Sequence, residues 1–200
     1  MMNHYYTNKP STESNRQQWN FDLKGYNFSF TTDTGVFSKK EVDFGSRVLI
    51  EAFEEPEVEG RMLDVGCGYG PIGLSLAKSF LNRQVDMIDV NERAVELAKE
   101  NAANNKVENV SIFTSNIYEK VTATDYAAIL SNPPIRAGKK VVHEILEKAW
   151  THLAPKGELW VVIQKKQGAP SAIEKLEALF EEVEVVTKKK GYSIIKSKKG

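Results

Sequence analysis

The distribution of hydrophobic and polar residues divides the chain into short blocks of two kinds. Near the amino end, Trp19, Phe21 and Leu23 alternate with polar residues, and the alternation resumes at Tyr26 after a Lys-Gly pair. Alternation with a period of two is typical of a strand that buries one face, and Lys-Gly favours a turn. The pattern therefore predicts a short β-hairpin with one aromatic face.

A helical spacing of apolar residues replaces this alternation from Glu41 onward. Apolar residues between Val42 and Phe53 recur every three or four positions, and Pro56 lies just past the end. Beyond Gly60, short apolar runs alternate with helical periodicity. We predict strands at 61–65, 84–90, 109–114, 126–130 and 158–163, helices at 72–80, 92–104, 139–153 and 171–180, and a closing hairpin of 183–187 with 192–196.

The succession of strands and helices predicts the fold class. Parallel strands need crossover connections, which place helices on both faces of a sheet. The closing hairpin adds an antiparallel pair at one edge. We therefore predict an α/β fold, doubly wound around a mostly parallel sheet with an antiparallel edge strand and preceded by the short β-hairpin.

Composition limits the domain organisation and the environment. Of the 200 residues, 41% are hydrophobic, and we predict one domain at 19–200 after a polar, flexible tail at 1–18. The formal net charge is zero, so any surface for a polyanion must be a local patch. Cys67 is the lone cysteine, and we find neither a secretory leader nor an apolar run of about 20 residues. We expect a cytoplasmic protein without a membrane segment.

A glycine-rich loop, Leu63–Gly70 (LDVGCGYG), joins a predicted strand to the next helix. Glycine at every second position lets the backbone bend tightly and approach a ligand at the carboxyl end of the strand. Gly68, Gly70 and Gly73 also match the dinucleotide pattern G-x-G-x-x-G, but the predicted strand ends before that pattern begins. The Asp64 carboxylate suits a ligand with a cationic ammonium and sulfonium better than a pyrophosphate. A merely structural turn is the third interpretation.

Two polar residues at the ends of later strands extend this ligand-binding pattern. Asp89 ends the next strand, where a carboxylate can accept both hydroxyl protons of an adenosine ribose. The alternative is that Asp89 caps the following helix, for which Asn91 is better placed. Asn116 follows the third strand and can face the edge of an adenine, although by itself it resembles an ordinary turn residue.

The segment Ser131-Asn132-Pro133-Pro134-Ile135 follows an apolar strand and carries the strongest chemical signal. The prolines exclude a helical backbone, so the segment is stiff and extended. The Asn132 side-chain oxygen and the Pro133 carbonyl can accept both N–H groups of an exocyclic amine, beside the apolar surface of Pro134 and Ile135. Such bonds hold the nitrogen toward a methyl donor and favour the transition state. We predict a catalytic group of these four residues that needs no metal.

Taken together, these motifs resemble those of class I S-adenosylmethionine-dependent methyltransferases that modify amino groups. The match includes Asp64 to Gly70, Asp89 and the Asn-Pro-Pro segment. More narrowly, Thr34–Ser38 (TGVFS) with Asp43 and Gly45 resembles the small single-domain members of the 16S ribosomal RNA guanine-N2 methyltransferase family. The stretch 157–170 and the closing Lys190-Gly191-Tyr192 resemble the same family.

The resemblance covers roughly residues 19–196 and implies a seven-stranded sheet, S-adenosyl-L-methionine as cofactor, and methylation of the exocyclic N2 of a guanine in 16S ribosomal RNA. It implies that the loop glycines contact the amino-acid part of the donor, Asp89 its ribose and Asn116 its adenine. The predicted donor-binding residues are Phe37, Ser38, Asp64, Gly66, Cys67, Gly68, Gly70, Asp89, Val90, Asn116, Ile117 and Asn132. Ile135 stands where such enzymes commonly carry an aromatic residue.

Basic residues near these strand ends suggest the partner. Arg136, Lys139 and Lys140 follow the Asn-Pro-Pro segment, and Lys165 and Lys166 follow a later strand. We expect them to bind phosphates of small-subunit ribosomal RNA or of the small ribosomal subunit, against the alternative of a solvated lysine-rich surface. Methylation of a protein glutamine amide or of adenine N6 stays open, as does a non-catalytic RNA-binding or ribosome assembly factor with this fold.

Overall fold

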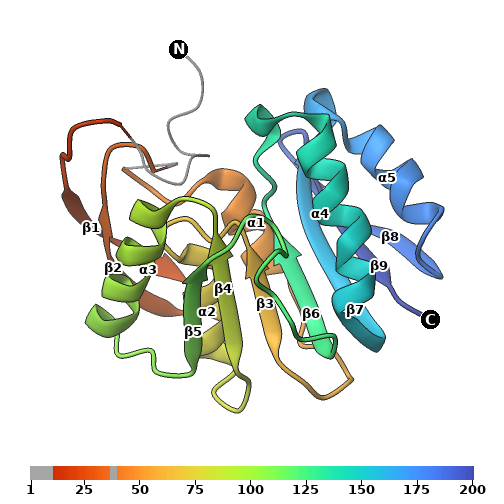
Figure 1. Ribbon diagram of the computed structural model, residues 1–200, viewed down its shortest axis with the longest axis horizontal. Helices are drawn as coiled ribbons and strands as arrows, with labels where there is room; N and C mark the ends of the chain where they lie inside the picture. Colours follow the sequence, from red (N-terminus) through yellow and green to blue (C-terminus); the bar gives the residue numbers. More distant parts are fainter. Residues whose placement is uncertain (1–10, 37–39) are drawn as a thin grey trace.

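The computed structural model describes residues 11–36 and 40–200, which form a seven-stranded sheet in the order β5-β4-β3-β6-β7-β9-β8 (Figure 1). The strands are β3 (Met62–Val65), β4 (Val85–Asp89), β5 (Val110–Thr114), β6 (Tyr126–Ser131), β7 (Leu153–Gln164), β8 (Glu182–Lys189) and β9 (Tyr192–Lys198). Strands β3 to β7 run parallel, whereas β9 lies between β7 and β8 and runs antiparallel to both. The predicted mostly parallel sheet with an antiparallel hairpin at one edge is confirmed.

Helices cover both faces of this sheet, as the alternating pattern predicted (Figure 1). The helices are α1 (Phe44–Ala52), α2 (Pro71–Ser79), α3 (Glu92–Asn104), α4 (Lys139–His152) and α5 (Ala169–Glu177), with short 3-10 turns η1 (Ile135–Ala137) and η2 (Lys165–Gln167). Successive residues of each strand point to opposite faces. Trp160 of β7 therefore joins the core with α1, α2 and α3, while its neighbour Leu159 joins the core with α4 and α5.

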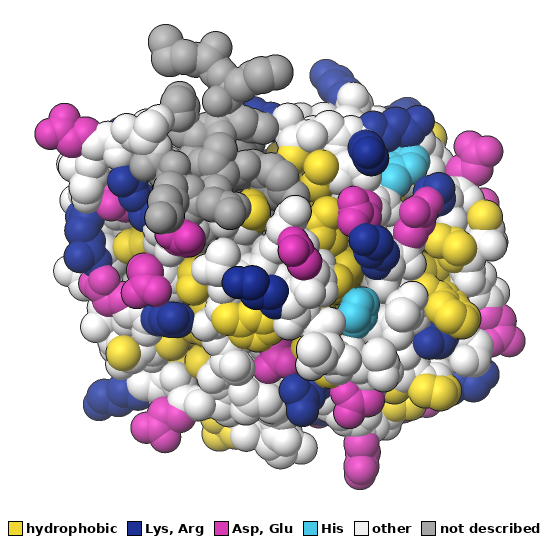
Figure 2. All heavy atoms as spheres, in the orientation of Figure 1, with side chains coloured by type: hydrophobic (Ala, Val, Ile, Leu, Met, Phe, Trp, Pro, Cys, Tyr) yellow, Lys and Arg dark blue, Asp and Glu magenta, His cyan; other side chains and the backbone are white. Residues whose placement is uncertain are grey.

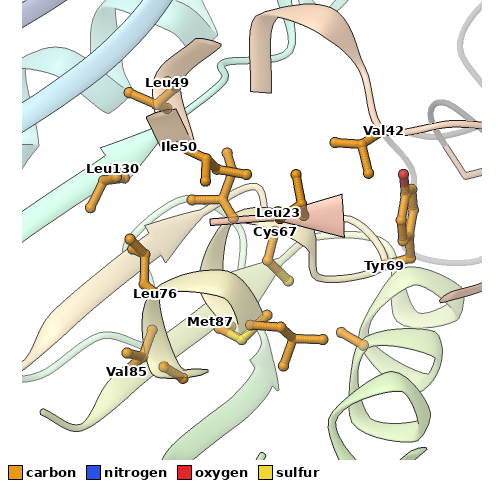
Figure 3. Packing of buried hydrophobic residues seen from close by; sticks show 14 of the residues in the cluster. Leu23, Val42, Leu49, Ile50, Cys67, Tyr69, Leu76, Val85, Met87 and Leu130 are labelled. Carbon is orange, nitrogen blue, oxygen red and sulfur yellow. The ribbon is translucent and has the colours of Figure 1, made fainter. Parts of the chain in front are cut away.

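The predicted amino-terminal hairpin is confirmed as β1 (Gln17–Leu23) and β2 (Tyr26–Thr32). Its aromatic face packs on the glycine loop, because the rings of Trp19 and Phe30 contact the ring of Tyr69. The side-chain amide of Asn101 in α3 donates to the carbonyls of both Thr31 and Tyr69. Figure 3 shows side chains from the hairpin, α1, the loop and the sheet meeting in this one core.

Most element bounds differ from the predicted ones by one to five residues, and the differences in β1, α1 and β7 are the most informative. Strand β1 begins at Gln17, so residues 17 and 18 belong to the hairpin and not to the predicted tail, of which residues 1–10 lie outside the described part. Helix α1 begins at Phe44, three residues later than predicted, because Asp43 has an extended backbone and caps the helix. Strand β7 already begins at Leu153, which pairs with Tyr126 of β6, and Lys156 and Gly157 bond with Lys199 just beyond β9.

No helix in the described ranges is long and apolar enough to span a lipid bilayer. Within the same ranges, we find no group of three His, Cys, Asp or Glu side chains that could hold a metal ion.

Candidate active site

A cavity of about 300 Å³ opens at the carboxyl ends of the parallel strands, where ligands bind in open α/β sheets. The predicted site residues that line it are Gly66, Cys67, Gly68, Asp89, Val90, Ile117, Asn132, Pro133, Pro134, Ile135 and Arg136. Other predicted residues, Asp64, Gly70, Asn116, Lys139, Lys140, Lys165 and Lys166, do not line this cavity. The predictions for Phe37 and Ser38 lie outside the described residues.

The glycine loop forms one wall of the cavity. The backbone N–H groups of Gly66 and Cys67 donate to the Ile88 carbonyl, at 2.9 and 2.8 Å, and hold the loop against β4. Gly66 and Gly68 have φ angles of +77° and +57°, and a Cβ added to either would meet no described atom within 4 Å. Such a Cβ would project into open space, which is therefore available to a ligand.

Gly70 serves a different purpose in this loop. A Cβ at this position would lie only 2.8 Å from Leu74 Cδ1, so the backbone can pack this closely on α2 only with glycine there. Gly70 caps the amino end of α2, and the first residues of that helix, Pro71 and Ile72, line the cavity. The amino end of α2, with the positive end of its dipole, thus lies at the site.

Asp64 lies beneath the loop and is completely buried. Its Oδ2 accepts a hydrogen bond of 2.9 Å from the Gly73 N–H, whereas Oδ1 has no partner among the described residues. Burial raises the pKa of Asp64 to about 7, and the charge of Asp89 adds to the rise, while the Gly73 N–H opposes it. A cationic ligand above the loop would favour the ionised form of this carboxylate.

Asp89 connects the glycine loop to the start of α3 at the cavity wall. One carboxylate oxygen accepts from the Gly68 N–H at 2.8 Å, and the other accepts from the Asn91 N–H at 2.9 Å. Burial raises the pKa of Asp89 to about 6 in spite of these bonds. Asn91 caps α3 through its own side chain, so the alternative role for Asp89 as the helix cap is not the one observed.

The segment after β5 presents backbone and an apolar side chain to the cavity. Ile117 has a φ angle of +53°, a left-handed conformation that is strained for a β-branched residue. The Ser115 hydroxyl donates to the Ile117 carbonyl at 2.8 Å and stabilises this turn. Ser115 and Ile117 line the cavity, whereas the side chain of Asn116 between them is exposed.

The Asn-Pro-Pro segment forms the opposite wall and is held firmly. The Ser131 hydroxyl donates to the Val65 carbonyl at 2.8 Å, which joins the ends of β6 and β3. The side-chain nitrogen of Asn132 donates to Asp43 Oδ2 at 2.8 Å and to Ser46 Oγ at 3.0 Å. Both amide hydrogens are thereby used, so the carbonyl oxygen of this side chain is the group left to accept a hydrogen bond from a ligand.

Several cavity residues were not predicted as site residues, among them Asp43, Ser46 and Tyr192. Asp43 and Ser46 come from the start of α1, and Tyr192 from the start of β9. The family resemblance includes Asp43 and Tyr192 but assigns them no role in the site. Their positions far from Asn132 in the chain carry no local signal, although Asp43 followed three residues later by Ser46 is typical of a helix start.

The predicted basic residues are exposed and lie close in the chain to residues that line the cavity, and we call this group the basic rim. Figure 2 shows Lys and Arg side chains at the upper right, over the end where α4 and α5 begin. The members of this basic rim are Arg136 in η1, Lys139 and Lys140 at the start of α4, and Lys165 and Lys166 in η2, all exposed. The Lys165 N–H donates to the Gly191 carbonyl at 2.8 Å, so the turn between β8 and β9, with Lys188, Lys189 and Lys190, joins the same rim.

A sheet of this order, with a glycine loop, a carboxylate and an Asn-Pro-Pro segment around one cavity, defines a class I methyltransferase of the S-adenosylmethionine-dependent type. The family model "Methyltransferase small domain" matches residues 27–196. The chain therefore belongs to the methyltransferase small domain family, which confirms the predicted class and supports the predicted cofactor.

Individual relatives agree with this assignment. "Uncharacterized protein YbxB" of Bacillus subtilis is 67% identical over the full length of both chains. "Ribosomal RNA small subunit methyltransferase C" of Vibrio parahaemolyticus is 34% identical over 82% of this chain and 48% of that protein. The chain thus spans about half the length of the curated ribosomal RNA methyltransferases it matches.

Solved structures show the same fold. A 16S rRNA N2 methyltransferase (RsmC) of T. thermophilus, in complex with AdoMet and guanosine, has a TM-score of 0.79 and 25% identity, over 92% of this chain and 51% of that chain. A methyltransferase of Pyrococcus furiosus has a TM-score of 0.66 and 25% identity, over 76% of this chain and 80% of that chain. The predicted resemblance to the guanine-N2 family is confirmed by these similarities.

Proposed function

We propose that this protein transfers a methyl group from S-adenosylmethionine to the exocyclic N2 of a guanine in 16S ribosomal RNA. The observation that carries the proposal is the fixed orientation of the Asn132 amide, whose hydrogens are bound by Asp43 and Ser46. Its carbonyl oxygen is available on the wall of the cavity that the glycine loop and Asp89 also line.

The residues on the loop side fit the methyl donor. The open space over Gly66 and Gly68 leaves room for its amino-acid part, and the buried, unpartnered oxygen of Asp64 places negative charge near a cationic ligand. Asp89 would accept from the ribose hydroxyls, and Ile117 would contact the adenine. When bound, S-adenosylmethionine supplies an electrophilic methyl group that needs no metal.

The residues on the opposite wall fit a planar target with an exocyclic amine. The Asn132 oxygen and the Pro133 carbonyl would accept its two N–H groups and hold the nitrogen lone pair in line with the methyl group. These bonds strengthen as the nitrogen gains positive charge, so they stabilise the transition state more than the ground state. Pro134 and Ile135 offer flat contact, and Tyr192 brings an aromatic ring to the cavity that position 135 lacks.

Relatives and surface charge support ribosomal RNA as the substrate class. Curated relatives of 30 to 36% identity are named ribosomal RNA small subunit methyltransferases, and the T. thermophilus structure holds guanosine. The basic rim beside the cavity mouth suits the phosphates around an extruded base. A protein glutamine amide and adenine N6 present the same planar N–H group, so they are the competing targets.

The test is transfer of labelled methyl from S-adenosylmethionine to small ribosomal subunits from cells that lack this protein. We expect label in N2-methylguanosine after digestion of the RNA, and loss of about 100-fold or more of the rate in Asn132→Ala with unchanged donor affinity. Label in N6-methyladenosine, or in a release factor offered in parallel, would replace guanine as the target. Binding of RNA without transfer to any substrate would favour the non-catalytic assembly factor.

A further inference from the structure

We infer that Asp43, assisted by Ser46, is a positioning residue that fixes which end of the Asn132 amide faces the substrate. This inference rests on the proposed function, because it concerns the group that would accept the target amine. The two hydrogen bonds of 2.8 and 3.0 Å from the Asn132 nitrogen connect α1 to the end of β6, across 89 and 86 residues of chain.

An asparagine amide needs such a constraint because its two ends are nearly equal in shape and opposite in chemistry. Rotation by half a turn would replace the carbonyl oxygen by an NH₂ group and direct hydrogen-bond donors at an amine that itself donates. A serine hydroxyl can donate or accept and so permits both orientations. An ionised carboxylate only accepts, so Asp43 allows only the orientation in which the nitrogen of Asn132 faces α1.

Asp43 is itself held in place by the helix that it begins. Its Oδ2 also accepts a hydrogen bond of 3.1 Å from the Ser46 N–H, and its carbonyl accepts from the Arg47 N–H at 3.0 Å. Leu49 and Ile50, both fully buried, anchor this helix on the sheet. The acceptor for Asn132 is therefore attached to a rigid element and not to a loop.

Close packing around this group leaves little freedom for it to rearrange. A Cβ at Gly45 would lie 3.0 Å from Tyr192 Cε1 and 3.1 Å from Asp43 Oδ2. Glycine at this position thus lets the tyrosine ring approach the carboxylate. The Tyr192 ring also packs on Phe44 with centroids 5.6 Å apart, which encloses the hydrogen bonds on that side.

The negative charge of Asp43 adds an electronic effect to the geometric one. A hydrogen bond to a carboxylate draws the amide proton and increases the electron density on the amide oxygen, because successive hydrogen bonds polarise one another. The Asn132 oxygen would then be a stronger acceptor for an amine that becomes positive in the transition state. Charge at Asp43 would thus reach the target nitrogen through Asn132 without direct contact.

Three variants separate positioning from the role of Asp43 as a helix cap. Asp43→Ser keeps a good cap but is too short to reach Asn132, whereas Asp43→Asn keeps an oxygen for both hydrogen bonds and removes the charge. We expect kcat to fall about 10- to 100-fold in Asp43→Ser and roughly 3- to 10-fold in Asp43→Asn. Ser46→Ala, which removes the weaker acceptor, should lose less than Asp43→Ser. Donor affinity should change less than about twofold in all three.

A second measurement follows the orientation without any substrate. In ¹H–¹⁵N spectra, the side-chain NH₂ signals of Asn132 can be assigned by their loss in Asn132→Ala. Their protons should exchange slowly with water in wild type and in Asp43→Asn, where the loss of charge shifts the signals less than in Asp43→Ser. In Asp43→Ser they should move toward the values of a solvated amide.

The outcomes of the two measurements are distinguishable. Wild-type signals and wild-type kcat in Asp43→Ser would overturn the inference. Absence of transfer by the wild-type protein to every substrate would overturn the proposed function instead. In that case, the amide signals still decide, because a shift in Asp43→Ser upholds the orientation by Asp43 and no shift overturns it.

Discussion

At the scale of single residues, the charge of the Asp64 carboxylate is costly because the group is completely buried. A raised pKa in the folded state means that the folded protein binds a proton more tightly than the unfolded chain does. Between the ordinary pKa of 3.8 and the folded value of about 7, the folded state therefore carries more protons. The free energy of unfolding must fall as the pH rises through this window, and the contribution is fully lost above pH 7.

We predict that Asp64→Asn removes this pH dependence. The amide oxygen can still accept from the Gly73 N–H, and the variant carries no charge to be desolvated. Relative to wild type, the variant should gain on the order of 1 to 4 kcal/mol in unfolding free energy between pH 5 and pH 8, measured by urea denaturation. The exposed Asp125→Asn is the matched control and should follow the wild-type curve. Parallel curves for wild type and Asp64→Asn would contradict the argument.

The cavity residues that were predicted from the sequence share one property. Each lies at or just after the end of a strand, within a recognisable local motif. Gly66, Gly68, Asp89 and Asn132 all line the cavity as expected. The position of Asp64 beneath the loop was not predictable, because a side chain that points below a loop has the same sequence context as one that points above it. The partners of the Asn132 amide were equally hidden, since they depend on how α1 docks on the sheet.

At the scale of elements, the glycine loop and α2 use their glycines for two separate purposes. Gly68 lines the cavity and a Cβ there would meet no described atom within 4 Å, whereas one at Gly73 would lie 2.6 Å from the Met87 side chain of β4. The first position should therefore affect ligand binding and the second the packing of α2 on the sheet.

We predict that alanine at these two positions affects donor affinity to different extents. Gly68→Ala should lower donor affinity at least about tenfold and cost roughly 1 to 2 kcal/mol of stability from its positive φ. Gly73→Ala should cost about 1 to 3 kcal/mol with a smaller effect on donor affinity, because the overpacked methyl group displaces Met87. Gly25→Ala, with a φ of +81° and open space around it, reports the backbone strain alone. Calorimetric titration measures the donor affinity of the three variants, and urea denaturation measures their stability. Equal donor affinities for Gly68→Ala and Gly73→Ala would refute the separate purposes of the two glycines.

Elements with strong periodicity were predicted to within a residue or two, and the errors have local causes. Helix α3 was predicted with its observed bounds, because Asn91 caps it and its apolar face is regular. Strand β7 was predicted to begin five residues too late, because Pro155 and Gly157 normally mark a turn. Pairing with the end of β9 overrides that preference, and no local pattern reports it.

At the scale of the whole molecule, neutral net charge conceals an uneven surface. The basic rim follows the carboxyl ends of the strands, where the cavity lies. Lys106 and Lys156 lie at the amino ends of the strands, before β5 and near the start of β7. A nucleic acid would therefore meet attractive charge mainly where the cavity opens.

We predict that Lys139→Glu with Lys165→Glu weakens RNA binding and flattens its salt dependence. Each lost phosphate contact should reduce the slope of log K against log salt by about 0.7 to 0.9. Lys106→Glu with Lys156→Glu is the control of equal charge change and should bind RNA much more tightly than the rim variant. Filter binding at several salt concentrations provides the comparison, and equal slopes for the two double variants would exclude the rim as the phosphate contact.

The order of strands was beyond reach of the sequence pattern. The closing hairpin was predicted as an edge, but its insertion with β9 beside β7 follows from long-range pairing. In this order Tyr192 pairs with Gln164, and both residues line the cavity. The last strand of the chain therefore contributes a residue to a site formed mainly by the first strands of the sheet.

The hydrogen bonds that join Asn132 to α1 also have a consequence for folding. They join residues that are 89 positions apart, so they can form only after α1 has docked beside the end of β6. Intermediates with docked strands but an undocked α1 would already possess the donor wall and would lack an oriented amide. If α1 docks after the strands, acquisition of methyl transfer during refolding should lag behind acquisition of donor binding, and activity would report the docking of α1.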